Sequence, residues 1–390
     1  MPRKYFFPVL LVITLVLCAC SPNLSPTSTA LPTSTVNNPT VAAATSTLPA
    51  ATATLAPSNT PVPLATATLA PSATLMPIAT NAAPLVTVPA STNYIDDRST
   101  PSQVIVSFYN AIARQEYSRA YDYYSDPATS LGNFTSFANG YNDTASVDLV
   151  FGPITGDPGM SQVYYTIPVI LKATAKNSTR SNFAACYIVY ETNPGVYGAP
   201  PISPMGIDRG SAQASNINSS DGSVLATACS AYPAGGNPPF SASTNSLSID
   251  KNNFVDNRSG PIETVSSLLN AINLKQYVRA YSYYQDPTNF PGPYDPYAAG
   301  YANMDTITVT FGTVQSEGAA GSTYYKVPLA EKVFTTTSTT QTFVGCYTLR
   351  LGQPANQTVP PFNPMGITAG TFNLVNNSTD VNTLLPTACN

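Results

Sequence analysis

Histidine and tryptophan do not occur in this chain of 390 residues, and charged side chains make up only 9% of it. The absence of histidine removes the commonest metal ligand and the commonest general base. Catalytic triads and zinc sites are therefore disfavoured, and we expect no metal, no cofactor and no catalytic residue. No cluster of lysine or arginine follows Lys4, so the charge pattern of a nucleic-acid-binding protein is missing as well.

A second absence marks residues 21–95, which contain no Asp, Glu, Lys or Arg. Threonine, serine, proline and alanine dominate, and the phrase ATATLAPS occurs at Ala51–Ser58 and again at Ala65–Ser72. Such a composition buries too little apolar surface to offset the entropy lost on ordering. We expect a disordered tether of intermediate stiffness. A stalk that carries sugars and a segment that binds cell-wall polymer are the alternatives.

Residues 1–20 contain a short basic stretch, an apolar stretch and the phrase LCAC at Leu17–Cys20. The apolar stretch has the length of a signal peptide and is too short for a comfortable membrane span. LCAC resembles the lipobox of bacterial lipoproteins, in which the last cysteine becomes the acylated N-terminus. The resemblance implies lipidation of Cys20 and a lipid-anchored position on the extracytoplasmic face of the cell membrane, at the cell surface or in the periplasm. An ordinary signal peptide or an N-terminal anchor helix is the alternative.

The remaining chain is a tandem duplication in which equivalent residues lie 160 positions apart. Pro101 matches Pro261 and Phe151 matches Phe311, and the match runs without a gap to the C-terminus. Each copy has the size of a single domain. We therefore expect a module 1 at residues 96–230 and a module 2 at residues 256–390, joined by a loop-like linker at 231–255.

Four cysteines remain if Cys20 is lipidated and the residues before it are removed. Each module carries two of them, 43 positions apart in both copies. Of the three possible pairings, the most economical one in an oxidising compartment lies within each module, as Cys186–Cys229 and Cys346–Cys389. A metal site of four thiolates is the alternative, but it needs two rigidly held modules and no CxxC spacing supports it.

The hydrophobic pattern within each module changes from helical to alternating. Pro101 and Pro261 follow the pattern of a helix start, and apolar residues continue at helical spacing. After Gly140 the apolar residues alternate with polar ones, as in a half-buried strand. We expect an α+β fold in which N-terminal helices pack on a curved antiparallel sheet of about four strands.

The stretch VIVSFYNAIARQEYSRAYDYYSDP, followed by a short aromatic helix and a strand meander, resembles the nuclear transport factor 2-like fold. Both copies share its most telling part, which is NAI, four intervening residues, a tyrosine, two further residues and Ala-Tyr. The resemblance implies a cone-shaped module. It also implies kinship with ketosteroid isomerases, polyketide cyclases and many non-catalytic extracytoplasmic modules.

Candidate pocket residues come from the duplicated phrases AYDYYSDP and AYSYYQDP. They are Tyr121, Tyr124, Asp126, Tyr281, Tyr284 and Asp286, with Glu331 from a predicted strand. The helical spacing of the tyrosines favours packing over ligand binding. The aspartates precede prolines, which favours a turn role over that of a general base.

The remaining charges have simpler interpretations. Arg119 and Arg279 are expected on a solvated helix face or beside a carboxylate rather than in an anion site. The charges before the first helix of each copy are expected to mark and cap that helix; these are Asp96, Asp97, Arg98, Asp256 and Arg258. Glu331 replaces Leu171 of the first copy, and a place past the sheet edge is favoured over a polar cavity in module 2 alone.

Three classes of function remain. The favoured one is a pair of binding or interaction modules held out on the tether, because two linked copies gain avidity for a repetitive glycan, peptide or envelope-protein ligand. An isomerase or cyclase that uses a Tyr/Asp or Glu pocket is the first alternative. A purely structural envelope lipoprotein is the second.

Overall fold

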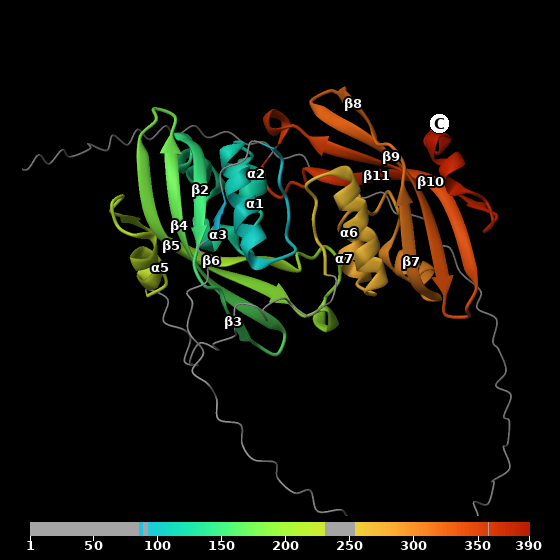
Figure 1. Cartoon of the computed structure of the whole chain (residues 1–390), viewed down its shortest axis with the longest axis horizontal. Coiled ribbons are helices and arrows are strands. Elements are labelled where there is room, and N and C mark those ends of the chain that lie inside the picture. The colour runs from blue at the N-terminus through green and yellow to red at the C-terminus, as the bar shows by residue number, and fades with distance from the viewer. Residues whose placement is uncertain (1–85, 89–92, 231–253, 358) are drawn as a thin grey trace, which may run out of the picture. The chain divides into compact units, whose positions relative to one another are not determined.

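The computed structural model describes residues 86–88, 93–230, 254–357 and 359–390. The predicted leader with Cys20, most of the tether and most of the linker lie outside these residues. Within the described part of the chain, no helix has the length and apolar character needed to cross a membrane. The described residues form two α+β modules, each with its own antiparallel sheet (Figure 1).

Module 1 begins with helices. The first, α1 (Pro101–Ala113), starts as its sequence predicts, because Thr100 accepts a hydrogen bond from the Gln103 amide at 3.3 Å and Pro101 occupies the first turn. Three short helices follow: α2 (Tyr117–Tyr121), α3 (Pro127–Leu131) and α4 (Phe134–Gly140).

The sheet of module 1 has a core of four strands in the order β2-β4-β5-β6. Their bounds are β2 (Thr144–Phe151), β4 (Gln162–Ala175), β5 (Arg180–Thr192) and β6 (Met205–Ser215). A short strand, β3 (Thr155–Pro158), also pairs with β4. Beyond β2 lies β1 (Val86–Val88), which pairs with it antiparallel. The predicted tether of residues 21–95 therefore ends too late, since the pairing begins at Val86.

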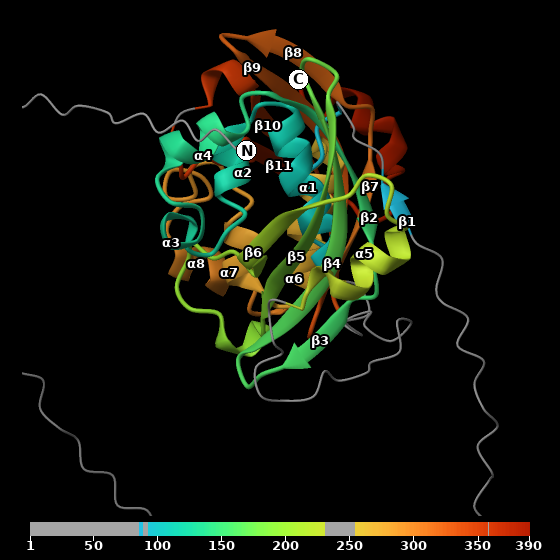
Figure 2. The ribbon, with the colours of Figure 1, turned by 90° about the vertical axis from the view of Figure 1, so that its left-hand side faces the viewer.

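Two layers cover the sheet of module 1. Figure 2 shows α1 and α4 on one side of the strands and α5 (Asp221–Ala228) on the other. On the side of α5, Leu225 packs with Val150 and Ile170 in a small cluster of its own. The main core lies on the other side, where α1 meets inward-facing residues such as Leu149 and Ile167.

Module 2 repeats this plan. Its helices are α6 (Pro261–Asn273), α7 (Tyr277–Tyr281) and α8 (Tyr294–Gly300). Its sheet has the order β7-β9-β10-β11, with β8 beside β9. The strands are β7 (Met304–Phe311), β8 (Gln315–Ala319), β9 (Ser322–Thr335), β10 (Thr340–Gly352) and β11 (Met365–Val375).

The two copies differ at their ends. Where module 1 has α5, module 2 has two 3-10 turns, Val381–Thr383 and Leu385–Thr387. Pro386 stands in place of Ala226 and cannot donate the backbone hydrogen bond that an α-helix needs. Both copies are crosslinked at this end, and the predicted disulfides Cys186–Cys229 and Cys346–Cys389 are confirmed.

A reciprocal joint connects the segments that precede α1 and α6, within the compact unit that contains both modules. The Arg98 amide donates to the carbonyl of Asp256 at 2.7 Å, and the Arg258 amide donates to the carbonyl of Asp96 at 2.6 Å. Each module thus gives the other the same hydrogen bond that it receives.

Side chains extend this joint in the same reciprocal way. Ser259 accepts from the Asp96 amide and Ser99 accepts from the Asp256 amide, both at 3.0 Å. An antiparallel bridge between Asp97 and Asn257 lies between them. The assignment of Asp96, Asp97, Arg98, Asp256 and Arg258 to helix capping is wrong, because these residues form the joint between the two copies.

Candidate functional site

The duplicated tyrosine phrase contains a buried tyrosine whose hydroxyl is hydrogen-bonded to charged residues. Tyr123, whose side chain is almost fully buried, donates its hydroxyl to Asp96 at 2.7 Å and accepts from Arg119 at 3.1 Å. Tyr283 makes the same pair of bonds with Asp256 and Arg279, at 2.9 and 3.0 Å. The phrase is repeated because it ties each module to its share of the joint.

Arg119 is fully buried, so its expected place on a solvated helix face is wrong, whereas the expected carboxylate partner exists. Its Nε donates to Glu116 at 2.6 Å, and its two terminal nitrogens reach the carbonyl of Ile95 and the side chain of Asn110. These acceptors offset the cost of burying a guanidinium. Arg279 is equally buried but donates to Gln276, which replaces Glu116.

The charges of the joint influence one another strongly. Burial alone raises the pKa of Asp96, but the guanidinium groups of Arg98, Arg119 and Arg258 outweigh burial and hold that pKa well below its usual range. Asp256 behaves in the same way beside Arg258. The carboxylates therefore stay ionised and serve as acceptors for the joint rather than as proton-transfer groups.

Four of the predicted pocket residues are absent from the lining of the cavity described below and form local hydrogen bonds instead. Tyr121 and Tyr281 donate their hydroxyls to the carbonyls of Gly132 and Gly292, at 2.5 and 2.8 Å, which fastens the loop that follows each helix. Asp126 caps α3 by accepting from the Thr129 amide. Asp286 accepts from the side chain of Thr288 and from the Asn289 amide. The favoured turn role of both aspartates is confirmed.

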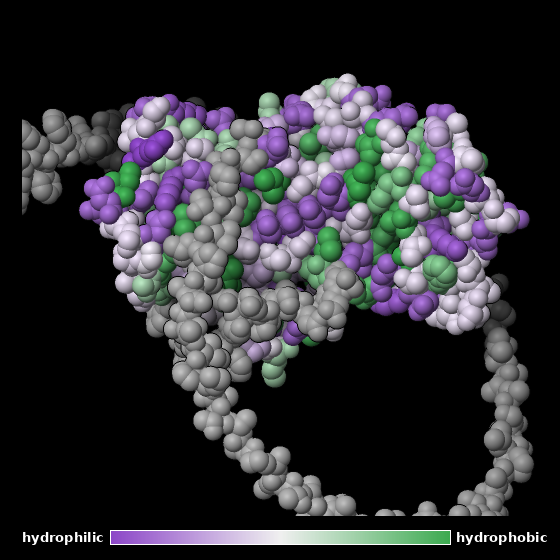
Figure 3. Space-filling model, viewed as in Figure 1, coloured by the Kyte–Doolittle hydropathy of each residue, from purple (hydrophilic) through white to green (hydrophobic). Residues whose placement is uncertain are grey.

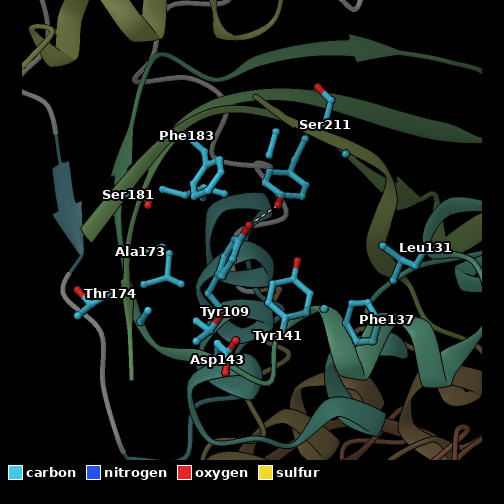
Figure 4. A pocket seen from close by; sticks show the side chains of 18 of the residues that line it. Tyr109, Leu131, Phe137, Tyr141, Asp143, Ala173, Thr174, Ser181, Phe183 and Ser211 are labelled. Atoms are coloured by element: carbon cyan, nitrogen blue, oxygen red, sulfur yellow. Dashed lines mark hydrogen bonds between the residues drawn. The ribbon is translucent and has the colours of Figure 1, made fainter. Parts of the chain in front are cut away.

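Module 1 contains a cavity of about 620 Å³ between its helices and its sheet (Figure 4). Its volume lies within the range of pockets that hold a small molecule. Of the predicted residues in module 1, Tyr124 lines it. The other main lining side chains are Tyr109, Phe137, Tyr141, Leu171, Phe183, Tyr187 and Ala212. These side chains are mostly apolar and aromatic and carry phenol hydroxyls. Serine and threonine side chains also line the cavity, at Ser136, Thr144, Thr174, Thr179, Ser181 and Ser211.

Two hydroxyls meet across the cavity. Tyr109 on α1 and Tyr187 on β5 form a hydrogen bond of 2.5 Å, which Figure 4 shows as a dashed line between helix and sheet. Gly210 leaves room for the Tyr187 ring, because a Cβ atom at position 210 would lie 2.5 Å from that ring. Burial raises the pKa of Tyr109 well above its usual value and the pKa of Tyr141 to about 12. These phenols are therefore neutral near pH 7.

The lining of this cavity carries little charge. Asp143 is its only ionisable acid among the described lining residues, and this side chain is exposed, while no lysine or arginine is present. Leu171 forms the wall at the position where module 2 has Glu331. Among the described lining residues, the buried side chains are therefore apolar groups and phenols.

Two positions near the equivalent space in module 2 carry larger side chains than their counterparts in module 1. Phe372 stands in place of Ala212, and its ring packs against Tyr347 with centroids 4.9 Å apart. Phe290, which replaces Ser130, packs against Tyr284 at 5.5 Å. Ala212 is exposed to the cavity, whereas Phe372 is half-buried in the module 2 core.

Glu331 lies inside the sheet of module 2, so the favoured place past the sheet edge is wrong. It pairs with Phe343 in the middle of β9, and its Oε1 atom is inaccessible and lacks a hydrogen-bond partner. Burial raises the pKa of its carboxyl to about 7. Its charge also contributes to raising the pKa of Tyr301 and Tyr347. The cavity and the buried carboxyl thus lie in different modules.

The face of the molecule in Figure 3 is mixed in character. Figure 3 shows polar and apolar residues mixed over the face in view, with a group of apolar residues over module 2 beside α6. The most exposed large apolar side chains include Met160, Val359 and Leu374, which stand singly. Within the described ranges, no three Cys, Asp or Glu side chains gather as a metal site would require.

The module 1 cavity is therefore the candidate functional site. The sequence could have revealed it through Ala212, a small residue whose counterpart is a phenylalanine. Comparisons of the chain with protein-family models, with curated proteins and with solved structures found no match. The function must therefore be inferred from the geometry of this site.

Proposed function

We propose that the chain is a lipid-anchored extracytoplasmic binding protein whose module 1 holds a small, uncharged, mainly apolar molecule. The cavity carries this proposal, because it has the size and aromatic lining of a small-molecule site and lacks charge in its interior. Module 2 is its structural counterpart, with Phe372 and Phe290 in the equivalent space.

The location rests on three features of the chain. The LCAC phrase supports lipidation at Cys20, and the uncharged segment after it supports a spacer between the lipid and the modules. Two disulfides are typical of an oxidising compartment outside the cytoplasm. Helices on one face of an antiparallel sheet, with a cavity between them, also support membership of the nuclear transport factor 2-like superfamily.

The alternatives fit the site less well. An isomerase or cyclase needs its base inside the cavity, but the buried carboxyl of Glu331 is in the other module. Avidity needs two working copies, whereas the two interiors differ at Ala212 and Phe372. Glycan, peptide and envelope-protein ligands stay predictions, and a small apolar ligand is the better match to this cavity.

Blocking the cavity tests the proposal. The probe is 1,6-diphenylhexatriene, an uncharged hydrocarbon that fluoresces only in dry apolar surroundings. The protein is the chain from Ser21 onward, secreted into an oxidising compartment so that both disulfides form. We expect saturable fluorescence in the parent chain. In Ala212→Phe we expect affinity at least about tenfold weaker, because the phenyl ring takes the place that Phe372 takes in module 2.

Ala212→Ser is the matched control, since it changes the same position and leaves the space open. Thermal unfolding followed by circular dichroism verifies that each variant is folded. Undiminished binding to folded Ala212→Phe would show that the probe does not occupy this cavity. Absence of binding to the parent chain would remove the proposed function itself.

A further inference from the structure

One tyrosine has different neighbours in the two modules. Tyr141 and Tyr301 are equivalent residues at the end of α4 and α8. In module 2, the Tyr297 ring packs edge-on against the rings of Tyr301 and Tyr284, with centroids 5.2 and 5.8 Å away. Module 1 has Phe137 in place of Tyr297, which removes that hydroxyl. Tyr141 therefore packs against a phenyl ring where Tyr301 packs against a phenol.

The Tyr141 side chain is held in position although its hydroxyl is not engaged. Its ring packs edge-on against Phe137 at 5.2 Å, and its carbonyl accepts from the Tyr117 hydroxyl at 3.3 Å. Figure 4 shows its hydroxyl pointing into the cavity, toward the bonded pair of Tyr109 and Tyr187. Among the described residues, no group forms a hydrogen bond with this hydroxyl.

We propose that Tyr141 is the polar anchor of the cavity and that its ligand is a neutral molecule with an apolar body and one acceptor oxygen, as in a ketone, ester or ether. This inference rests on the proposed function. A phenol donates one hydrogen bond, and a ligand that fills the cavity would shield this donor from water, so an acceptor at this point keeps it satisfied. A carboxylate ligand is disfavoured because no cation lines the cavity to balance it.

A matched pair of ligands tests the anchor. 2-Acetylnaphthalene and 2-ethylnaphthalene have nearly the same shape and differ in one carbonyl oxygen. Each is titrated against the chain from Ser21 onward, loaded with diphenylhexatriene, and displacement of the probe gives its Kd. We expect the ketone to bind the parent chain about 3- to 10-fold more tightly than the hydrocarbon, the range of one neutral hydrogen bond.

Tyr141→Phe removes only the hydroxyl. We expect this variant to keep its Kd for diphenylhexatriene and for 2-ethylnaphthalene, and to bind the ketone no better than the hydrocarbon. Tyr301→Phe is the control, since it makes the same change in module 2 and should leave the preference for the ketone intact.

The outcomes separate the two proposals. If the parent chain binds diphenylhexatriene but does not prefer the ketone, the anchor is wrong and the binding function stands. The anchor is also wrong if Tyr141→Phe weakens both naphthalenes equally, because Tyr141 is then only part of the wall. If diphenylhexatriene does not bind the parent chain, the proposed function fails, and the anchor fails with it.

Discussion

Glu331 stands on β9 where module 1 has Leu171, and its neighbours include the phenols of Tyr284, Tyr301 and Tyr347. Burial raises the pKa of this carboxyl from its ordinary value of 4.5 to about 7. A group with a higher pKa in the folded chain stabilises the fold in its protonated form. This contribution is fully present below about pH 4.5 and is lost as the pH rises through 7.

We therefore expect the parent chain to lose on the order of 2 kcal/mol of unfolding free energy between pH 5 and pH 8 through this residue. Glu331→Gln keeps the shape and cannot ionise, so its stability should vary less with pH by that amount. Urea unfolding at both pH values measures the difference. Glu317→Gln, on the exposed strand β8, serves as the control. Equal pH dependence in parent and Glu331→Gln would contradict the assignment.

The residues that could be predicted from sequence are those whose roles are local. Asp126 precedes a proline and caps the next turn, and the helix start at Pro101 depends only on its neighbours. Arg119 could not be placed, because its partners Ile95 and Asn110 come from other parts of the chain. The exchange of Leu171 for Glu331 marks this position as unusual, but periodicity gives the face of a strand and not what fills the space above it.

In module 1 the cavity and the disulfide are associated with different helices. The cavity lies on the side of the sheet that faces α1 and α4, while α5 lies on the other side. The disulfide fastens the end of α5 to β5, and an ion pair of 2.9 Å between Lys172 and Asp221 fastens its start. The cavity and the crosslinked helix thus lie on opposite faces of the same strands.

We expect the double variant Cys186→Ala/Cys229→Ala to lose on the order of 3 kcal/mol of unfolding free energy, the usual contribution of a crosslink that closes a loop of this length. Because the crosslink lies on the face away from the cavity, the Kd for diphenylhexatriene should stay within about twofold of the parent value at temperatures where the variant is folded. Urea unfolding and probe titration measure the two quantities. A folded variant that no longer binds would show that α5 shapes the cavity through the sheet.

The order of helices and strands could be predicted because the spacing of apolar residues changes from helical to alternating along each copy. The duplication repeats that change. The α+β class and the antiparallel sheets are confirmed. Sequence did not predict β1, because Val86–Val88 lies in an uncharged region and its strand exists only through pairing with β2. It also did not predict the loss of α5 in module 2, although Pro386 carried the signal.

For the whole molecule, attachment to the membrane follows from the proposed lipidation. We expect the full-length protein to stay in the membrane fraction and mass spectrometry to find a diacylglyceryl group on Cys20. Cys20→Ala should move the protein to the soluble fraction, since the lipid is the expected membrane contact. Ser21→Ala, one position further on, is the control. Unchanged membrane retention of Cys20→Ala would contradict the lipoprotein assignment.

The reciprocal joint has an evolutionary consequence. The Arg98 amide donates to the Asp256 carbonyl and the Arg258 amide donates to the Asp96 carbonyl. Such paired hydrogen bonds are the pattern of a symmetric dimer, in which one surface meets its own copy. Two separate subunits encoded by one gene must share every mutation, so neither can fill its interior while its partner keeps an opening. Fusion into one polypeptide frees each half to change alone, and it holds the partner at a fixed effective concentration however dilute the protein becomes. The difference between the equivalent residues Ala212 and Phe372 is a change of this kind.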